Sequence, residues 1–580
     1  MQISEAFERL WSFLAYAPER PWNFIHPHFW VFYTLVLALD ALFRPGRWAR
    51  SLYLWVVSIF FYFKTSGLFF FLLIFTIHMD YFLGHVVYRS RAPWLRRILV
   101  TLSVITNLGI LAYFKYAYFF TESFNELLNT HFKVINYLAV FANTMAGGNY
   151  FRVDQIILPV GISFYTFQTI SYTVEIYRGR LTPARSLADF GFFVAFFPQL
   201  VAGPIMRASE FLPQIYQPRS VQKEDFGRGL FWMLNGLVKK VFVADYLAVN
   251  FVDRVFANPS MFTGFENLMA TFCYSLQVYC DFSGYTDIAY GVALLMGFEL
   301  NRNFNSPYKA ANVADFWRRW HMSLSTFLRD YLYIPLGGNR RAGVGSVVML
   351  GVISLFTALL AVPYVRQWQY MDYPGPGDYF ILTVVAFLTA FGPLALLMYA
   401  MGYWWQRLAR FIHTEINLMI TMLVGGLWHG ASWMFVIWGG LNGAGLMAYK
   451  LFSGFRRVNI SEMPAWRRTL GITITFVFIS FTRIFFRSAD LDTARSMIDQ
   501  ILQHFGGNFV PERIALNGRC FLLFTAGMVI HWLPDFLKEK LRSGLARSPL
   551  AVQAAIACLV VFIIYQATST ELTPFIYFQF

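Results

Sequence analysis

Apolar runs long enough to cross a lipid bilayer recur along the chain, and they limit its fold more than any other feature. A membrane-spanning helix needs about 20 apolar residues, and such runs lie at 67–88, 98–120, 156–177 and 267–298. Charged residues make up only 14% of the 580 positions, whereas soluble domains average about 25%. So few charges cannot coat a soluble surface of this size. The sequence therefore predicts an all-α polytopic integral membrane protein and excludes disorder, collagen, coiled coil and soluble repeats.

Clusters of basic residues set the expected orientation in the membrane. Cytoplasmic loops are enriched in Lys and Arg, and basic clusters lie at 44–50, 89–97, 178–185 and 301–342. Placing them on the cytoplasmic side of the membrane gives roughly 11–14 membrane helices and puts both termini outside. Residues 186–203, apolar but bounded by charge, are expected to be re-entrant. The 301–342 segment is too polar to span and is expected to form interfacial helices on the cytoplasmic side.

We divide the chain into N-terminal membrane helices at 1–150, a core at 151–450 and C-terminal helices with an aromatic tail at 451–580. The net charge of +15 fits basic loops on a lipid bilayer. No basic stripe interleaved with aromatics occurs in a soluble segment, so nucleic acid is not an expected partner. The four cysteines lack metal-ligand spacing, and no metal site or tightly bound cofactor is predicted.

His429 is the sharpest candidate for chemistry, because an ionisable group at membrane depth is costly. It lies in the sequence GGLWHGASW, where glycines let backbones approach closely and Trp428 and Trp433 can wall a cavity. A histidine there can act as a general base. The alternative is a buried histidine that makes one structural hydrogen bond.

His321 is the second candidate. In the sequence DFWRRWHMS, a helix would place Trp317, Trp320 and His321 on one face. Arg318 and Arg319 are suited to an acidic partner or a phosphate. The alternative is an interfacial amphipathic helix whose arginine side chains extend to the water phase.

A third polar group, Asp281, Ser283 and Asp287, interrupts the apolar run CDFSGYTDIAYG. These side chains are expected either to line a hydrophilic tunnel or to hold helices together by hydrogen bonds. Asp80 and Lys115 are also expected to pair inside the membrane, in a structural role.

From about residue 156 to its end, the chain resembles the bacterial polysaccharide and cell-wall branch of the membrane-bound O-acyltransferase family. That branch acts in alginate and peptidoglycan O-acetylation and in teichoic-acid D-alanylation. The resemblance rests on long, ordered stretches: LPVGISFYTFQTISYTVEIYRG, FFPQLVAGPI, DFSGYTDIAYGVALLMGFEL, NFNSPYKAANVADFWRRWHMSLSTFLRDYLYIPLGGNR, GGLWHGASWMFVIWGGLNG, FTRIFFRSADLDTA and FIYFQF.

The resemblance implies a many-helix fold with a funnel on each face meeting at a central tunnel. The family's two characteristic histidines correspond to His321 and His429, and the catalytic role is usually assigned to the second. We therefore expect an acyl group, most simply acetyl, to pass from a cytoplasmic thioester, acetyl-CoA or a loaded acyl carrier, toward an extracytoplasmic glycan.

The acceptor hydroxyl is open at this stage. Tyr577, in the C-terminal ELTPFIYFQF, is one candidate, because a similar tail in the small partner protein of the D-alanylation system resembles an acyl acceptor. Final transfer to alginate, cellulose or peptidoglycan would then fall to a separate periplasmic acetyltransferase, as the family often implies. The alternative for the tail is an interfacial anchor formed by its aromatic side chains.

Two other function classes fit intramembrane polar residues. A transporter for an acyl donor or a glycan precursor would perform no chemistry and would tolerate His429→Gln if that group only binds. It would also be expected to show inverted repeats, which the sequence lacks. A structural subunit of a polysaccharide synthase would tolerate loss of either histidine. A sterol or lipid acyltransferase of the eukaryotic type fits less well, because the matching motifs belong to the bacterial branch.

Overall fold

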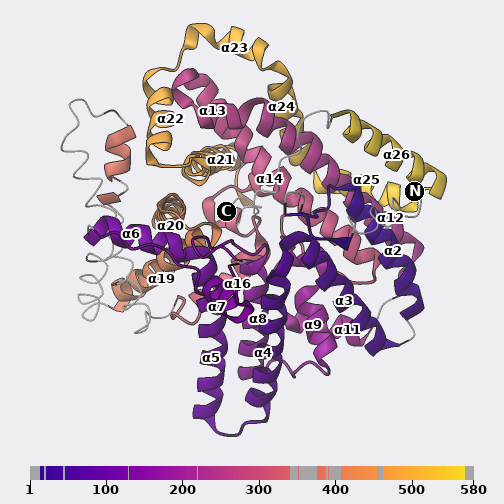
Figure 1. Ribbon diagram of the computed structural model, residues 1–580. Helices are drawn as coiled ribbons and strands as arrows, with labels where there is room; N and C mark the ends of the chain where they lie inside the picture. Colours follow the sequence, from indigo (N-terminus) through magenta and orange to yellow (C-terminus); the bar gives the residue numbers. More distant parts are fainter. Residues whose placement is uncertain are drawn as a thin grey trace.

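The computed structural model describes most of the chain. The described part consists of helices, turns and loops and contains no β-strand (Figure 1). The described ranges are 14–18, 21–43, 46–128, 130–149, 151–217, 220–339, 406–453 and 462–567, with scattered positions between 351 and 393. The all-α fold is thus confirmed. The aromatic tail falls outside the described residues.

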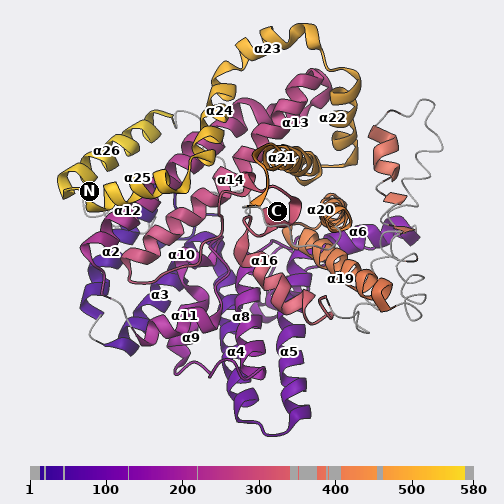
Figure 2. The same ribbon diagram turned by 180° about the vertical axis from the view of Figure 1, so that it is seen from behind.

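The first third of the chain forms a helical layer with a projecting hairpin. Its helices are α2 (Pro27–Phe43), α3 (Arg47–Ser66), α4 (Phe70–Arg89), α5 (Pro93–Leu111), α6 (Ala117–Leu128) and α7 (Tyr137–Ala146). A π-helical turn, η2 (Ala112–Tyr116), joins α5 to α6. Both views show α4 and α5 extending together at the bottom (Figures 1 and 2).

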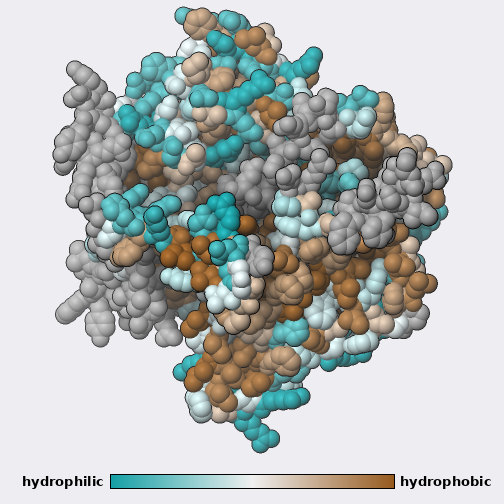
Figure 3. All heavy atoms as spheres, in the orientation of Figure 1, coloured by the Kyte–Doolittle hydropathy of each residue, from teal (hydrophilic) through white to brown (hydrophobic). Residues whose placement is uncertain are grey.

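The surface of this hairpin is suited to lipid. Hydrophobic residues predominate over the α4–α5 projection (Figure 3). Large apolar side chains are exposed on both helices, namely Phe71, Phe75, Phe82, Ile98, Leu102 and Ile105. A water-soluble protein rarely leaves so large a contiguous apolar patch uncovered, so this face is a lipid-facing surface.

The middle of the chain supplies the buried core. Its helices are α8 (Ile162–Tyr177), α9 (Leu187–Ala195), α10 (Phe197–Leu200), α11 (Ala208–Tyr216), α12 (Lys223–Leu237), α13 (Asp253–Ala257), α14 (Gly264–Leu295), α15 (Val313–Trp317) and α16 (Met322–Leu328). Two π-helical segments, η3 (Val238–Asp245) and η4 (Ala248–Val252), follow α12, and a third, η7 (Arg329–Tyr333), follows α16. The segment expected to be re-entrant, 186–203, forms α9 and α10, which are buried in the protein.

Close contacts between glycines fix the packing of the central helix α14. A Cβ atom at Gly236 on α12 would collide with the backbone oxygen of Gly284, and one at Gly291 would lie 2.5 Å from the backbone oxygen of Gly229. Small residues at such a crossing let two helix backbones approach closely, as in membrane helix pairs. The contacts place α14 at the centre of the molecule, beside α21 (Figures 1 and 2).

The last part of the chain covers this core. Its helices are α19 (Gln406–His429), α20 (Trp433–Phe452), α21 (Ala465–Arg487), α22 (Leu491–Gln503), α23 (Val510–Leu516), α24 (Gly518–Trp532), α25 (Asp535–Arg547) and α26 (Leu550–Ala567). In both views α22, α23 and α24 arch over the top of the molecule, and α25 and α26 lie against its side (Figures 1 and 2).

Several helices meet the requirements for crossing a bilayer. Within the described ranges, three stretches are long and apolar enough, and up to five if two bent helix pairs each form one span. The polytopic character is confirmed, while the count of 11–14 crossings stays a prediction. Criteria of length and hydropathy undercount the membrane helices of such a fold. Core helices such as α14 carry buried polar residues, and others, such as α9 and α10, are short.

Candidate active site

His429 is the last residue of α19, at a tight turn into α20. A Cβ atom at Gly426 would collide with the backbone oxygen of Phe435, and one at Gly430 would collide with the Phe435 ring. The glycines predicted to allow close approach therefore do so. They let the two helices cross directly beside the histidine, which fixes the end of α19 against α20.

Aromatic rings surround the His429 imidazole, which is 3% exposed. The centroids of Trp428 and Trp438 lie 5.1 Å from its centroid, and that of Phe486 lies 5.4 Å away. All three contacts are edge-on, so the ring is held on several sides without being stacked. Such an apolar cage excludes bulk water and strengthens electrostatic interactions within it.

His321 lies in the short connection between α15 and α16, fully buried and with a left-handed backbone (φ 42°). Its Nδ1 is 3.1 Å from the side-chain oxygen of Asn303. The same oxygen accepts hydrogen bonds from the backbone N–H and the hydroxyl of Ser323. A backbone N–H can only donate, so this atom is the amide oxygen and Nδ1 carries the proton.

The tautomer has a chemical consequence. With its proton on Nδ1, the neutral ring presents the lone pair of Nε2 as an acceptor. Burial lowers the pKa of the His321 imidazole, which keeps it neutral at physiological pH. Asn303 and Ser323 thus determine both the orientation and the protonation of this ring.

The structure brings the two histidines together although 108 positions separate them in the sequence. Their ring centroids are 6.3 Å apart and their planes are inclined by 69°. Trp428 lies beside both, with its centroid 5.8 Å from that of His321. The two residues predicted from separate motifs therefore form one site.

A contact that the sequence did not predict anchors the end of α19. Lys115, in the π-helical turn η2, donates to the backbone oxygens of Trp428 (2.6 Å) and His429 (3.1 Å), and Tyr116 donates to that of Leu427 (2.7 Å). The last carbonyls of a helix lack partners within it, and a cation there is favourable. The expected pairing of Lys115 with Asp80 is wrong, because Asp80 accepts from nearer polar side chains, Ser103 and Asn107.

Two cavities meet at His429. One, of about 70 Å³, is lined by Lys115, residues 158–164, Val201, Trp428 and His429. The other, of about 20 Å³, is lined by Val278, Phe316, Trp320, His429, Trp438, Asn442, Ile479, Arg483 and Phe486. A buried imidazole between two hollows can exchange a proton with a group that enters from either.

The other predicted tryptophans occupy different positions around this centre. Trp320 lines the smaller cavity. Trp317 contacts Trp438, with ring centroids 5.8 Å apart, and so lies one layer further out. Trp433 packs against Phe119 of α6, at 5.2 Å, and lines neither cavity.

The predicted arginines lie away from the histidines. Arg318 is exposed, and Arg319 forms an ion pair with Asp315 one turn earlier, at 3.0 Å. Their predicted role toward an anionic donor stays a prediction. Tyr577 lies outside the described residues.

The polar group on α14 forms ion pairs with the adjacent segment η3. Asp281 lies 2.5 Å from Lys240, and Asp287 lies 2.6 Å from Lys239. Ser283 is buried between them on the same helix. These contacts favour the interhelical role over the tunnel-lining role, because both carboxylates are already neutralised by a cation.

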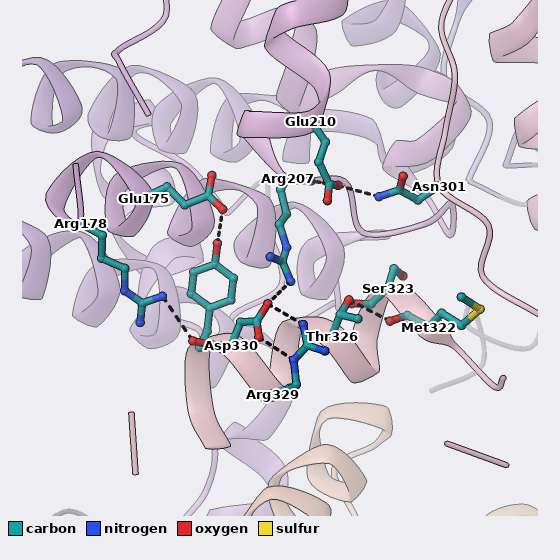
Figure 4. A network of polar contacts seen from close by, with 11 residues as sticks. Glu175, Arg178, Arg207, Glu210, Asn301, Met322, Ser323, Thr326, Arg329 and Asp330 are labelled. Atoms are coloured by element: carbon teal, nitrogen blue, oxygen red, sulfur yellow. Dashed lines mark hydrogen bonds and ion pairs between the residues drawn. The ribbon is translucent and has the colours of Figure 1, made fainter. Parts of the chain in front are cut away.

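A charged network holds the segment that follows His321. Asp330 accepts from Arg207 at 2.7 Å and from Arg329 at 2.7 Å, so that two guanidinium groups flank one carboxylate (Figure 4). Tyr331 donates to Glu175 of α8 at 2.7 Å. The network ties η7 to α8 and to the start of α11, and thereby fixes the loop that carries His321.

Comparison with known proteins identifies the family of this chain. The model of MBOAT, the membrane-bound O-acyltransferase family, matches residues 183–360, which include His321. The probable alginate O-acetylase AlgI of Azotobacter vinelandii is 34% identical over 473 residues, covering 80% of this chain and 75% of that protein. The peptidoglycan O-acetyltransferase of Helicobacter pylori is 32% identical over 473 residues, covering 77% and 72%.

A more distant relative performs a different acyl transfer. The teichoic acid D-alanyltransferase of Bacillus subtilis is 32% identical over 180 residues, covering 30% of this chain and 45% of that protein. The two O-acetylases match over most of both chains. The chain therefore belongs to the membrane-bound O-acyltransferase family and is an O-acyltransferase.

Proposed function

We propose that the protein moves an acetyl group from a cytoplasmic thioester, acetyl-CoA or a loaded carrier, across a bacterial inner membrane for O-acetylation of an extracytoplasmic glycan. The observation that carries this proposal is the position of His429, a buried imidazole between two cavities. Two relatives that match most of this chain are named alginate O-acetylase and peptidoglycan O-acetyltransferase. Their names support acetyl as the transferred group and a glycan as its destination.

His429 acts as the general base. It accepts the proton of an acceptor hydroxyl while the hydroxyl oxygen bonds to the acyl carbon, and the electron pair of the carbonyl moves to its oxygen. When the carbonyl re-forms, the carbon–sulfur bond breaks and the thiolate takes the proton from His429. A positioned general base contributes about 10²–10⁴-fold in rate. His321 and Trp428 keep the reacting groups in place on one side of the imidazole.

The topology and the acceptor belong to the same proposal. Both termini lie outside, the basic 301–342 region faces the cytoplasm, and the donor approaches from there. Tyr577 is the candidate acceptor from which a periplasmic acetyltransferase takes the group for the glycan. Tyr577→Phe tests this step, because full glycan acetylation in that variant would eliminate the carrier role.

The central test measures ester-linked acetate on isolated cell-surface glycans. A deletion strain is complemented with the wild type, His429→Ala or His413→Ala, and membrane abundance is measured in each. His413 is a matched control, since it lies on α19 about 24 Å from His429 at 1.5 Å per residue. We expect ester-linked acetate to vanish with His429→Ala and to persist with His413→Ala. The glycan fraction that loses its acetate identifies the acceptor polysaccharide.

The opposite result is equally informative. Wild-type acetate in His429→Ala cells would exclude the general-base role and favour a transporter or a scaffold. Loss with Ala but full activity with His429→Gln would favour a binding role in transport, because glutamine can hydrogen bond but cannot take up a proton at neutral pH.

A further inference from the structure

Arg483 of α21 lines the smaller cavity together with His429. The residue is 4% exposed, and it lies on one of the helices long and apolar enough to cross a bilayer. A cavity of about 20 Å³ has room for one water-sized group. The arginine and the histidine therefore face a space that fits a single oxygen atom.

The hydrogen-bond partners that the described residues provide for the Arg483 guanidinium are uncharged. Its Nη1 donates to the backbone oxygen of Ser275 at 3.0 Å and to the hydroxyl of Tyr308. Its carbon lies 4.5 Å from the centroid of Trp320, over the ring face. Throughout the described chain, no carboxylate lies within ion-pair distance of it.

Another buried cation shows the contrast. Lys240 lies within 2.7 Å of Asp245 and 2.5 Å of Asp281. A buried charge is costly unless it is paired, and the ring contacts of Arg483 offset only part of that cost. A cation that is kept without a counter-ion in the wall of the cavity that also contains His429 is suited to a negative charge that forms during the reaction.

The proposed transfer generates one such charge. When the hydroxyl oxygen bonds to the acyl carbon, the carbonyl electron pair moves to its oxygen and produces an oxyanion. Fixed donors aimed at this atom are commonly the largest single contribution to acyl-transfer catalysis. The side-chain amide of Asn442, which also lines the cavity, already donates to the backbone oxygen of Trp438 at 2.8 Å and to the Thr482 hydroxyl at 3.4 Å. The guanidinium is the cation of this cavity.

We propose that Arg483 is a catalytic residue that binds the oxyanion of the tetrahedral intermediate in the cavity it shares with His429. The proposal rests on the proposed function, since it assigns a role in the same transfer. The carbonyl oxygen enters the 20 Å³ cavity, takes up the electron pair there, and returns it when the thiolate leaves.

The test compares Arg483→Met with Arg487→Gln. Arg487 is a matched control, because it lies one turn further on α21, pairs with Asp253 at 2.8 Å and lines neither cavity. Ester-linked acetate on surface glycans is followed after induction and normalised to membrane-inserted protein, and Tm is measured on the purified full chain. Removing one oxyanion donor costs about 10²–10³-fold in kcat, so we expect Arg483→Met to lose acetate to that extent. Tm should not fall, because the Ser275 oxygen keeps the Tyr308 hydroxyl as a donor and the variant removes an unpaired buried charge. Arg487→Gln should stay within about threefold of the wild type, as surface ion pairs contribute little.

Two controls separate the possible failures. His429→Ala is measured alongside: if it keeps acetate, the proposed function itself is wrong. If His429→Ala is inactive and Arg483→Met is fully active, only the oxyanion role is overturned. A parallel fall of Tm and acetate in Arg483→Met would also overturn it, in favour of a structural arginine.

A second variant covers the case in which Arg483→Met does not accumulate. Val278→Ile adds one methylene to the wall of the same cavity and leaves the arginine in place. We expect it to lose at least tenfold in acetate at wild-type abundance, because the oxyanion no longer fits. Unchanged acetate in Val278→Ile would overturn the proposal.

Discussion

Lys115 Nζ lies 2.6 Å from the backbone oxygen of Trp428, so the π-helical turn after α5 is bonded directly to the end of the helix that carries His429. The same ammonium reaches the His429 oxygen at 3.1 Å. A residue from the first third of the chain thus sets the position of the proposed general base, which lies 314 positions later. It does so through hydrogen bonds to backbone oxygens.

Lys115→Met should therefore impair catalysis without removing a reacting group. The variant leaves two buried carbonyls without their donor, which costs about 1–3 kcal/mol each. A shift of about 1 Å at His429 is enough to lower the rate by about 10²-fold. Glycan acetate per inserted protein and Tm should both fall, whereas Lys133→Met, at an exposed position, should change neither. Full acetylation by Lys115→Met would show that the bond is dispensable.

Asn303→Asp should introduce a pH dependence. The new carboxylate beside Nδ1 would raise the pKa of His321, which burial otherwise lowers. The protonated ring has no lone pair on Nε2, so acetylation should fall as the pH drops through the raised pKa, while the wild type has no such decline there. The measurement is the rate of acetyl transfer by isolated membranes against pH. The exposed Asn305→Asp in the same loop is the control, and identical profiles for both variants would contradict the assigned tautomer.

Asp281→Asn distinguishes the two roles considered for the polar group on α14. If the carboxylate holds α14 to η3 through Lys240, its loss should destabilise the protein by about 1–3 kcal/mol and leave the activity of each folded molecule unchanged. Asp535→Asn, which removes an ion pair whose carboxylate is 77% exposed, should cost less than about 1 kcal/mol. A large loss of specific activity at wild-type Tm would favour the tunnel-lining role.

The charge around His429 should also select the acyl group. Lys115 and Arg483 line its two cavities, and no carboxylate among the described residues lines either of them. A D-alanyl group carries an ammonium, and two like charges about 4 Å apart repel by about 4 kcal/mol at an effective dielectric of 20. Membranes given equal amounts of acetyl- and D-alanyl-pantetheine thioesters should transfer acetyl at least about 100-fold faster. Comparable rates would mean that the two cations do not contact the acyl group.

The two histidines were predictable because each lies in a short motif whose residue types are unusual for a membrane segment. The 6.3 Å between their rings was not, since it depends on how α15, α16, α19 and α20 pack. Three further residues of the site gave weaker signals. Asn303 is one of many polar loop residues, and its function depends on a hydrogen bond. Lys115 and Arg483 were visible as isolated cations in apolar runs, but their partners are backbone oxygens and rings, which no residue pattern specifies.

The expectations that failed did so because they depended on how the helices pack, which no residue pattern specifies. Asp80 and Lys115 have opposite charges and seemed complementary, yet Asp80 found nearer donors in Ser103 and Asn107. Trp433 is four positions from His429 but lies beyond a turn, so its ring faces α6. Sequence spacing assigns a side chain to a helix face, whereas the direction of the chain after a break such as Gly430 decides what that face meets.

The small size of the cavity behind His429 matters for the cell as well as for the reaction. A space for one oxygen atom cannot hold the continuous file of water along which protons move through a membrane. In the proposed transfer the acetyl group is uncharged, so its passage past the imidazole would require no electrical work, whereas a leaking ion would dissipate about 2.3 kcal/mol for every 100 mV of membrane potential. The aromatic cage around this histidine is thus suited to admit an acyl group without opening a path for ions.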